Sequence, residues 1–344
     1  MKKILFAAAA LLMFIPAFAQ GEQPEYGYKQ TAFQSAPKVG GYIIGSYKYS
    51  DLEGAHGGPG FGCRLIRLYV DGSIYNDFKY RIQFQANGTP HVKDFYIEWA
   101  KYTAFSVKVG QFKRAFTFEN PMNPWDVGVG DFSFLVQKFA GMGDRLGEAN
   151  MGGRDLGLQI QGDFLPIGND NHNLIHYQLG IWNGQGINLA DADGKKDIIG
   201  TIQFQPITGL KIGVFGWKGN WINASKTSLK RERISAGLSY DRDNWTLRAE
   251  YATAIAGEKE QSGASDAFYV TAGIPVTDWF KVYLKWDEFR AAATKESSHD
   301  MFSAAANFRL HKNLNFQLEY RRHDNNLLAN PGYNEIWVQT YIRF

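Results

Sequence analysis

The stretch Phe78-Lys79-Tyr80-Arg81-Ile82-Gln83-Phe84-Gln85 alternates apolar and polar side chains along its whole length. Successive side chains of a β-strand point to opposite faces, so this stretch predicts a strand with one apolar and one charged face. Burying unpaired charges in a dry core is costly, so we expect the charged face to be solvated.

The same period of two recurs from residue 40 to the end of the chain. No helical period competes over a long stretch, although a few helical turns fit inside the longest connection. The expected fold class is therefore all-β, with an even number of antiparallel strands that suits a closed barrel. We expect sixteen strands, at residues 40–49, 62–71, 77–86, 92–100, 104–112, 155–164, 174–183, 197–205, 209–219, 231–241, 244–253, 266–274, 279–290, 300–310, 313–323 and 334–344.

Composition excludes several classes of protein. The 344 residues include 37 Lys+Arg, 34 Asp+Glu and one cysteine, which rules out an intramolecular disulfide and a cysteine-based metal cluster. Apolar residues at 44% and aromatic residues at 15% exclude a disordered chain. The near-balanced charge gives no support for a nucleic-acid partner.

The first nineteen residues have the pattern of a secretory signal peptide. Lys2 and Lys3 precede an apolar run over residues 4–15, and small residues precede a cleavage site after Ala19. A membrane anchor is the alternative, but the run is too short to span a bilayer. We expect residues 20–39 to form an N-terminal extension and residues 40–344 to form the barrel.

Connection lengths favour a transmembrane barrel. Short turns alternate with longer polar, glycine-rich connections, which is typical of a barrel with turns on one rim and loops on the other. Aromatic residues at outward positions gather at the short-turn ends, as a membrane-interface girdle requires, whereas a soluble barrel has no reason to sort them to one rim. These aromatic residues are Phe78, Trp99, Phe105, Phe164, Phe204, Tyr240, Trp245, Phe280, Phe308 and Phe316.

The longest connection, residues 113–154, lies between the fifth and sixth expected strands. It is rich in apolar residues, which an external loop would expose to water. Sixteen strands leave an aqueous lumen, so we expect this third loop to fold inward, pack on the wall and form the narrowest point. The alternative is a cap on the barrel or a contact between protomers.

Basic residues on neighbouring strands and at the start of this segment are candidates for an anion path. The candidates are Lys79, Arg81, Lys108, Lys113 and Arg114. The alternative is ordinary wall charges paired with Asp94 and Glu98. Removing Lys2 and Lys3 with the signal lowers the formal charge from +3 to +1, and inward positions carry both signs. We therefore expect a mixed lumen.

Charged residues of the long segment are candidates for the constriction. They are Asp126, Asp131, Arg145 and Arg154. Arg145 and Arg154 have nearby acidic residues, so they are expected either to pair locally and hold the loop shape or to act as a filter. Those acidic residues are Asp144, Glu148 and Asp155. Asp126 and Asp131 are expected to contribute a negative electrostatic potential at the constriction.

Three groups of residues resemble the phosphate-selective porin O/P family of Gram-negative outer membranes, in a Bacteroidetes-like version. They are 64–72 with the strand 78–84 and Asp94-Phe95-Tyr96-Ile97-Glu98-Trp99; Val109-Gly110-Gln111-Phe112-Lys113 with Phe116 and Glu119; and Gly180-Ile181-Trp182-Asn183-Gly184-Gln185-Gly186. The resemblance implies a sixteen-stranded barrel, a homotrimer and an inward-folded third loop. Phosphate-selective members line the pore densely with arginine and lysine, so the mixed charges here predict weak phosphate specificity.

The expected function is that of an outer-membrane porin for passive diffusion of small hydrophilic solutes or anions such as phosphate. Two alternatives are a barrel enzyme, for example a lipase or protease, and an adhesion or structural barrel. No zinc, Walker or serine-hydrolase motif occurs in the sequence, so we expect no catalytic residue, metal or cofactor. Expected partners are outer-membrane lipid and the outer-membrane assembly machinery, which would read the terminal Phe344.

Overall fold

The computed structural model describes residues 37–52, 59–148 and 152–344. The signal peptide at residues 1–19 and most of the expected extension at 20–39 lie outside the described residues. The first strand begins at Lys38, two residues before the expected start of the barrel.

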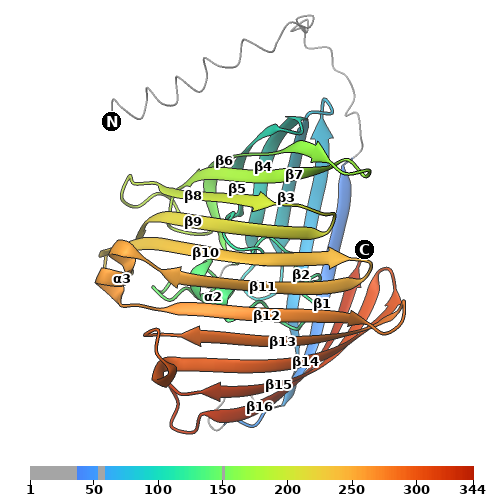
Figure 1. The fold of residues 1–344 in the computed structure, drawn as a ribbon, viewed down its shortest axis with the longest axis vertical. Coiled ribbons are helices and arrows are strands. Elements are labelled where there is room, and N and C mark those ends of the chain that lie inside the picture. Colours follow the sequence, from blue (N-terminus) through green and yellow to red (C-terminus); the bar gives the residue numbers. More distant parts are fainter. Residues whose placement is uncertain (1–36, 53–58, 149–151) are drawn as a thin grey trace, which may run out of the picture. The chain divides into compact units, whose positions relative to one another are not determined.

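Sixteen antiparallel strands form a closed barrel in which each strand pairs with the next and β1 pairs with β16 (Figure 1). This confirms the fold class and the expected number of strands. The strands are β1 Lys38–Ser50, β2 Gly60–Ile74, β3 Phe78–Gln85, β4 His91–Tyr102, β5 Phe105–Lys113, β6 Arg154–Ile167, β7 His172–Trp182, β8 Asp197–Phe204, β9 Leu210–Ile222, β10 Ser228–Arg242, β11 Trp245–Ala254, β12 Asp266–Pro275, β13 Phe280–Arg290, β14 Ser298–His311, β15 Leu314–Asn325 and β16 Gly332–Arg343.

Strand β3 shows why the period of two produces this wall. Ile82 and Phe84 are exposed on one face, while Gln83 between them is 3% exposed on the other. The same alternation along the remaining strands gives the barrel an exposed apolar face and a polar face. A bilayer supplies what the exposed face needs, since lipid-facing and polar-facing residues alternate in membrane barrels.

Tight turns join the strands at one end of the barrel. Tyr75 and Asn76, between β2 and β3, both have positive φ angles of 49° and 44°. Asp243 and Asn244, between β10 and β11, have φ angles of 51° and 66°. Two consecutive positive φ values give a turn whose twist matches that of the flanking strands, so these turns fix the register of both hairpins.

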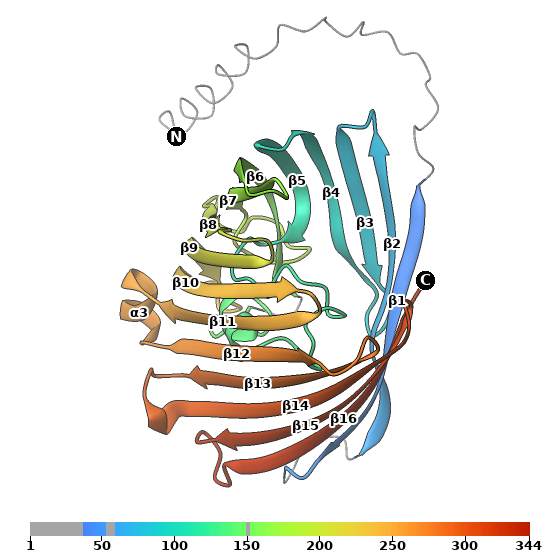
Figure 2. The same ribbon diagram turned by 45° about the vertical axis from the view of Figure 1, so that its right-hand side comes forward.

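The segment between β5 and β6 contains a short helix, α2 (Phe134–Phe139), which is capped by the Ser133 hydroxyl. Apolar residues of the segment, including those of α2, are buried against the polar face of the wall. For example, Phe116 packs edge-to-face on Trp217, with ring centroids 5.5 Å apart. Figure 2 shows α2 behind β11 and β12. Two further helices, α3 (Ala256–Ser262) and η2 (Lys295–Ser297), lie in longer connections that the sequence pattern treated as loops. Among the described residues, no helix is long and apolar enough to cross a bilayer.

Candidate functional site

Wall carboxylates hold the backbone of the segment between β5 and β6 at three of its described residues. A carboxylate that accepts a buried N–H satisfies a donor that irregular backbone would otherwise leave unpaired. Three such bonds run from the segment to the wall: Phe118 N–H to Glu250 (3.1 Å), Gly130 N–H to Glu319 (2.6 Å) and Phe134 N–H to Asp287 (2.9 Å). The accepting strands β11, β13 and β15 thus fix the segment at three places along its length.

Buried ion pairs add a second attachment near the end of the segment. Arg114 is fully buried and its Nη2 lies 2.9 Å from Glu148 and 3.2 Å from Asp155. Arg231 of β10 also contacts Glu148, at 2.8 Å. Both guanidinium groups lie over the ring of Trp217, at 4.8 and 4.7 Å from its centroid. Arg114 is therefore part of the attachment, and its guanidinium is engaged by Glu148 and Asp155.

Asp144 is the acidic centre of this attachment. Arg233 of β10 donates to Asp144 at 2.8 Å and to Glu258 of α3 at 2.9 Å. Burial alone would raise the pKa of Asp144, but the adjacent Arg233 guanidinium outweighs burial and lowers that pKa to about 2. Asp144 is consequently ionised at neutral pH and ties the segment to Arg233 of β10, which in turn contacts Glu258 of α3.

Arg145 and Arg154 do not pair with the acidic residues nearest to them in sequence, so the predicted local pairing is wrong. Arg145 reaches Glu258 of α3 at 2.7 Å, and Arg154 reaches Asp94 of β4 at 2.7 Å. Sequence proximity fails here because the wall and α3 bring carboxylates closer than the segment itself does.

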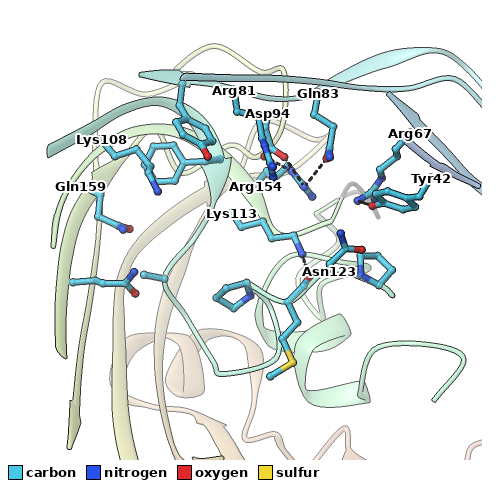
Figure 3. Close-up of a pocket in the computed structure, with 17 residues that line it drawn as sticks. Tyr42, Arg67, Arg81, Gln83, Asp94, Lys108, Lys113, Asn123, Arg154 and Gln159 are labelled. Carbon is cyan, nitrogen blue, oxygen red and sulfur yellow. Dashed lines mark hydrogen bonds and ion pairs between the residues drawn. The ribbon is translucent and has the colours of Figure 1, made fainter. Parts of the chain in front are cut away.

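A cavity of about 210 Å³ lies between the segment and strands β1 to β7 (Figure 3). Its charged lining consists of five basic residues and one acidic residue: Arg67, Arg81, Lys108, Lys113, Arg154 and Asp94. Three of the basic residues have carboxylate partners, namely Arg81 with Asp71 at 2.6 Å, Lys108 with Glu98 at 3.2 Å, and Arg154 with Asp94. We call this space the first cavity.

Two cations of the first cavity have a different environment. Arg67 is 6% exposed, and its Nη1 donates to the Tyr42 hydroxyl at 2.7 Å. Lys113 Nζ donates to the carbonyl of Asn120 at 2.7 Å and to the carbonyl of Met122. Within the described part of the chain, no carboxylate lies within 4 Å of either charge. The Arg67 Nε is also buried without a hydrogen-bond partner, so this guanidinium retains capacity for an anion.

The structure brings together three of the five predicted anion-path residues: Arg81, Lys108 and Lys113. Lys79 lies opposite Glu98 in the register of β3 and β4 and is exposed outside the cavity lining. Arg67 and Arg154 join the cavity although the sequence reasoning did not group them with it. The alternation along the strand predicts that Arg67 lies on the polar face. It does not predict that Arg67 lacks a carboxylate partner.

A second cavity of about 560 Å³ lies at the short-turn end, between Trp125–Gly128 and the wall from β10 to β16. Asp126 lines it, and burial raises the pKa of that carboxyl, which weakens it as a source of negative field. Asp131 is elsewhere and pairs with Arg64 at 2.6 Å. Two predicted constriction carboxylates are therefore separated by the structure, and one is neutralised by an arginine.

One cross-strand row links the two cavities. Tyr42 of β1 lies opposite Arg343 of β16 on one side and Arg67 of β2 on the other. Arg343 lines the second cavity and lies over the Trp125 ring at 4.9 Å, while Tyr42 and Arg67 line the first. Basic side chains therefore continue from one cavity to the next across a single tyrosine.

Comparison with solved structures shows a similar fold in several bacterial proteins. The chain is similar to an anion-selective porin from Comamonas acidovorans, with a TM-score of 0.66 and 14% identity over 90% of this chain and 99% of that one. OprB of Pseudomonas putida gives a TM-score of 0.63 and 9% identity, over 90% and 94% of the two chains. The trimer form of OmpT, an outer membrane protein of Vibrio cholerae, gives 0.59 and 12%, over 90% and 99%.

A search of curated protein sequences finds no significant match. The sequence model that describes Gram-negative porins, in contrast, matches residues 7–327. This match confirms the expected porin at the level of the wider family, and the phosphate-selective branch stays a prediction. Since the match covers most of the chain and the barrel is closed, the protein belongs to the Gram-negative porin family and is an outer-membrane channel.

Proposed function

We propose that this channel conducts small hydrophilic solutes by passive diffusion and prefers anions. The observation that carries the proposal is the charge of the first cavity, where five basic residues line the space with one carboxylate. Paired charges cancel at short range, so the preference rests on Arg67 and Lys113, which have no carboxylate within 4 Å among the described residues. In a narrow, poorly screened passage such charges attract anions and repel cations.

We further propose that the segment between β5 and β6, expected at residues 113–154, folds into the barrel and forms its constriction. Support comes from the hydrogen bonds of Phe118, Gly130 and Phe134 to side chains on the polar face of the wall. A cap on the barrel rim or a loop reaching a neighbouring protomer would not place three separate backbone sites against strands β11, β13 and β15. Solutes then pass between this segment and the opposite side of the wall, along the first cavity.

We propose that phosphate binds only weakly at this constriction. Tight phosphate binding needs several charge-assisted bonds at one point. Three of the five basic residues in the first cavity already donate to carboxylates, which leaves two for a phosphate. We therefore expect little block of the conductance by phosphate at low millimolar concentration.

We also propose how the protein is exported and how it assembles in the membrane. The trimer form of OmpT supports a homotrimer, the leader at residues 1–19 is proposed to direct secretion through the inner membrane, and Phe344 is proposed to be read by the assembly machinery. Outer-membrane lipid covers the exposed apolar face of the strands.

Planar-bilayer conductance in a KCl gradient tests the function. The expected result is stable channel steps with an anion-selective reversal potential, which Arg67→Gln and Lys113→Gln each move toward zero. Lys218→Gln is the matched control, because Lys218 is an exposed cation on the apolar face of β9. A cation-selective reversal potential would contradict the anion preference. An absence of steps from folded protein would favour the enzyme or adhesion alternatives.

A further inference from the structure

Three glutamines of neighbouring strands form a hydrogen-bonded row on the polar face of the wall. They are Gln159 and Gln161 of β6 and Gln178 of β7, and Gln161 lies opposite Gln178 in the register of these strands. Gln161 Nε2 donates to a carboxylate oxygen of Glu98 at 2.7 Å. Its Oε1 accepts from Gln159 at 2.6 Å and from Gln178 at 3.2 Å. We call these three residues the glutamine row.

Glu98 fixes the orientation of all three amides. Lys108 lies 3.2 Å from this carboxylate and stabilises its charge, and an ionised carboxylate can only accept, so Gln161 donates with its nitrogen and accepts with its oxygen. Gln159 and Gln178 then both donate to that oxygen. Each of these two side chains therefore keeps a carbonyl oxygen that the row does not use, and the hydrogen-bond network determines which end of the amide that is.

The two unused carbonyl oxygens belong to side chains that line the first cavity. Gln159 is 2% exposed, and among the described residues its Oε1 has no hydrogen-bond partner. Gln178 is half-buried, and the described part of the chain provides no donor to its Oε1 either. Figure 3 shows Gln159 at the edge of this cavity. A buried acceptor without a partner costs free energy, which a ligand with a matching donor recovers.

Two amides on other elements offer donors to the same cavity. Asn123 of the segment accepts from the Trp125 N–H at 3.1 Å with its oxygen, which leaves its nitrogen for a ligand. Gln83 of β3 accepts from Arg154 at 3.4 Å with its oxygen, which likewise leaves its nitrogen. The lining therefore carries uncharged acceptors on β6 and β7 and uncharged donors on β3 and on the segment.

This combination of acceptors and donors selects hydroxyl groups. A fully ionised oxyanion only accepts and cannot bond to the oxygens of Gln159 and Gln178, whereas a hydroxyl donates and accepts at once. Several hydroxyls on one rigid ring bond to several amides at a small entropic cost. The volume of about 210 Å³ is below the roughly 300–1,000 Å³ of sites for drug-sized ligands, which favours one sugar ring over an oligosaccharide.

The aromatic rings of the first cavity are engaged by cations. Lys108 Nζ lies over the rings of Tyr96 and Phe112, at 4.8 and 5.4 Å from their centroids. Arg67 lies over the ring of Tyr42, at 5.7 Å. A ring face covered by a cation is less available for stacking on a sugar, so recognition depends on the amides.

We propose that the glutamine row makes the first cavity a binding site for neutral monosaccharides, which glucose represents. Gln159 and Gln178 determine the specificity, and Gln161 positions them. The inference deepens the proposed function and rests on it for access of the sugar through an open pore, but binding is measurable without conductance.

Saturation-transfer NMR titration of the folded, detergent-purified protein with glucose tests the site. The comparison solute is the dimethyl ether of triethylene glycol, which is neutral and of similar mass but has oxygens that can only accept. We expect saturable binding of glucose and at least about fivefold weaker binding of the ether, because the ether offers no donor to Gln159 and Gln178.

Substitution of a glutamine by methionine keeps the length of the side chain and removes its hydrogen-bonding groups. Gln159→Met and Gln178→Met are each expected to weaken glucose binding about fivefold, and the double variant at least about twentyfold. Gln203→Met is the matched control, because Gln203 lies on the polar face of β8 outside the lining of the first cavity. We expect it to change binding less than about twofold. Heat-modifiable mobility on gels verifies that each variant is folded.

A bilayer experiment gives an independent readout. At equal viscosity, glucose is expected to reduce the chloride current more than the ether does. In the double variant, the two solutes are expected to reduce the current equally.

The outcomes separate the two proposals. No glucose binding by folded protein whose reversal potential is anion-selective would overturn this site and leave the proposed function intact. Equal binding of glucose and the ether would also overturn it, as would equal losses in Gln203→Met and the double variant. Glucose binding that the double variant loses, in a protein that shows no channel steps, would support the site and contradict the proposed function.

Discussion

His299 of β14 and His323 of β15 share a hydrogen bond, with 2.9 Å between Nε2 of the first and Nδ1 of the second. One imidazole must donate and the other accept, so the bond exists only while at least one ring is neutral. Phe134 at the start of α2 packs on His299 with ring centroids 4.3 Å apart. The pair therefore connects the wall to the segment between β5 and β6.

Acidification is expected to disturb this contact. Protonation of both rings breaks their bond and places two cations side by side. Lys138 of α2 adds a third positive charge that acts on His299, while a carboxylate oxygen of Glu335 lies 3.4 Å from Nε2 of His323. Tyr333, stacked on His323, is the remaining titratable neighbour.

We predict that acidification far enough to protonate both rings at least doubles the frequency of channel closures in planar bilayers. His323→Phe keeps the aromatic ring on Tyr333 but cannot titrate, so its closures are expected not to change on the same acidification. The same pH response in wild type and His323→Phe would contradict the role of the pair.

Asp144→Asn tests the buried attachment of the segment. Removing one partner of a buried ion pair leaves the charge of Arg233 incompletely compensated, which lowers the free energy of unfolding by about 3–5 kcal/mol. Because the pKa of Asp144 is lowered to about 2 in the fold, its contribution is present above its usual titration range near pH 4 and disappears as the pH falls toward 2. Urea unfolding at pH 7 and pH 2 measures both effects, and Asp243→Asn, at an exposed turn position, is the control. Equal destabilisation of Asp144→Asn at both pH values would exclude the ion pair as the cause.

Gly128→Ala tests how closely the segment approaches the wall. Gly128 has φ +97°, and a Cβ there would lie 2.3 Å from the Tyr283 ring. We expect a loss of about 1–3 kcal/mol in the free energy of unfolding and a broader distribution of single-channel conductance levels, because the segment must move away from β13. Gly143 has a similar φ of +106° with open space around it, so Gly143→Ala isolates the backbone strain. If both variants behaved alike, crowding against Tyr283 would be unimportant.

Phe344→Ala separates assembly in the cell from stability of the finished barrel. The backbone of Phe344 bonds reciprocally with Gly41, at 2.9 and 3.0 Å, while its ring is exposed. Substitution therefore preserves the closing hydrogen bonds and removes only the aromatic side chain. We expect at least a severalfold lower amount of assembled protein in the outer membrane, measured by heat-modifiable mobility, with unchanged refolding in detergent. A matching defect in refolding would assign the effect to stability instead of recognition.

The strands could be predicted from the sequence because the alternation within each strand separates its apolar face from its polar face. The alternation around Ile82, Gln83 and Phe84 depends on neighbours in the chain and on which face meets water, so local pattern was sufficient. The helix α3 was missed because its seven residues form a polar connection with no apolar stripe. The helix holds the segment between β5 and β6 and strand β10 together, because its Glu258 forms ion pairs with Arg145 and Arg233.

The charge arrangement could be predicted only in part. Strand phase identified Arg81, Lys108 and other inward cations, but not which of them are neutralised. That distinction depends on contacts between distant positions, such as Arg154 with Asp94 and Arg64 with Asp131. Counting charges of both signs predicted a mixed lumen. The structure sorts the same charges into neutral buried pairs and two cation-lined cavities, a segregation that no count along the sequence contains.

The seam between β1 and β16 has a consequence for the order of folding. It pairs Ile44 with Tyr341, so the wall cannot close before the last strand has been synthesised. Gln339 of that strand also donates to the carbonyl of Gly130 at 3.3 Å. Contacts this distant in sequence form late, because their loop-closure entropy is spent before they contribute any stabilisation. The final hairpin therefore completes the wall and the hydrogen bond to Gly130 in one event, and a chain that ends before β16 would lack both.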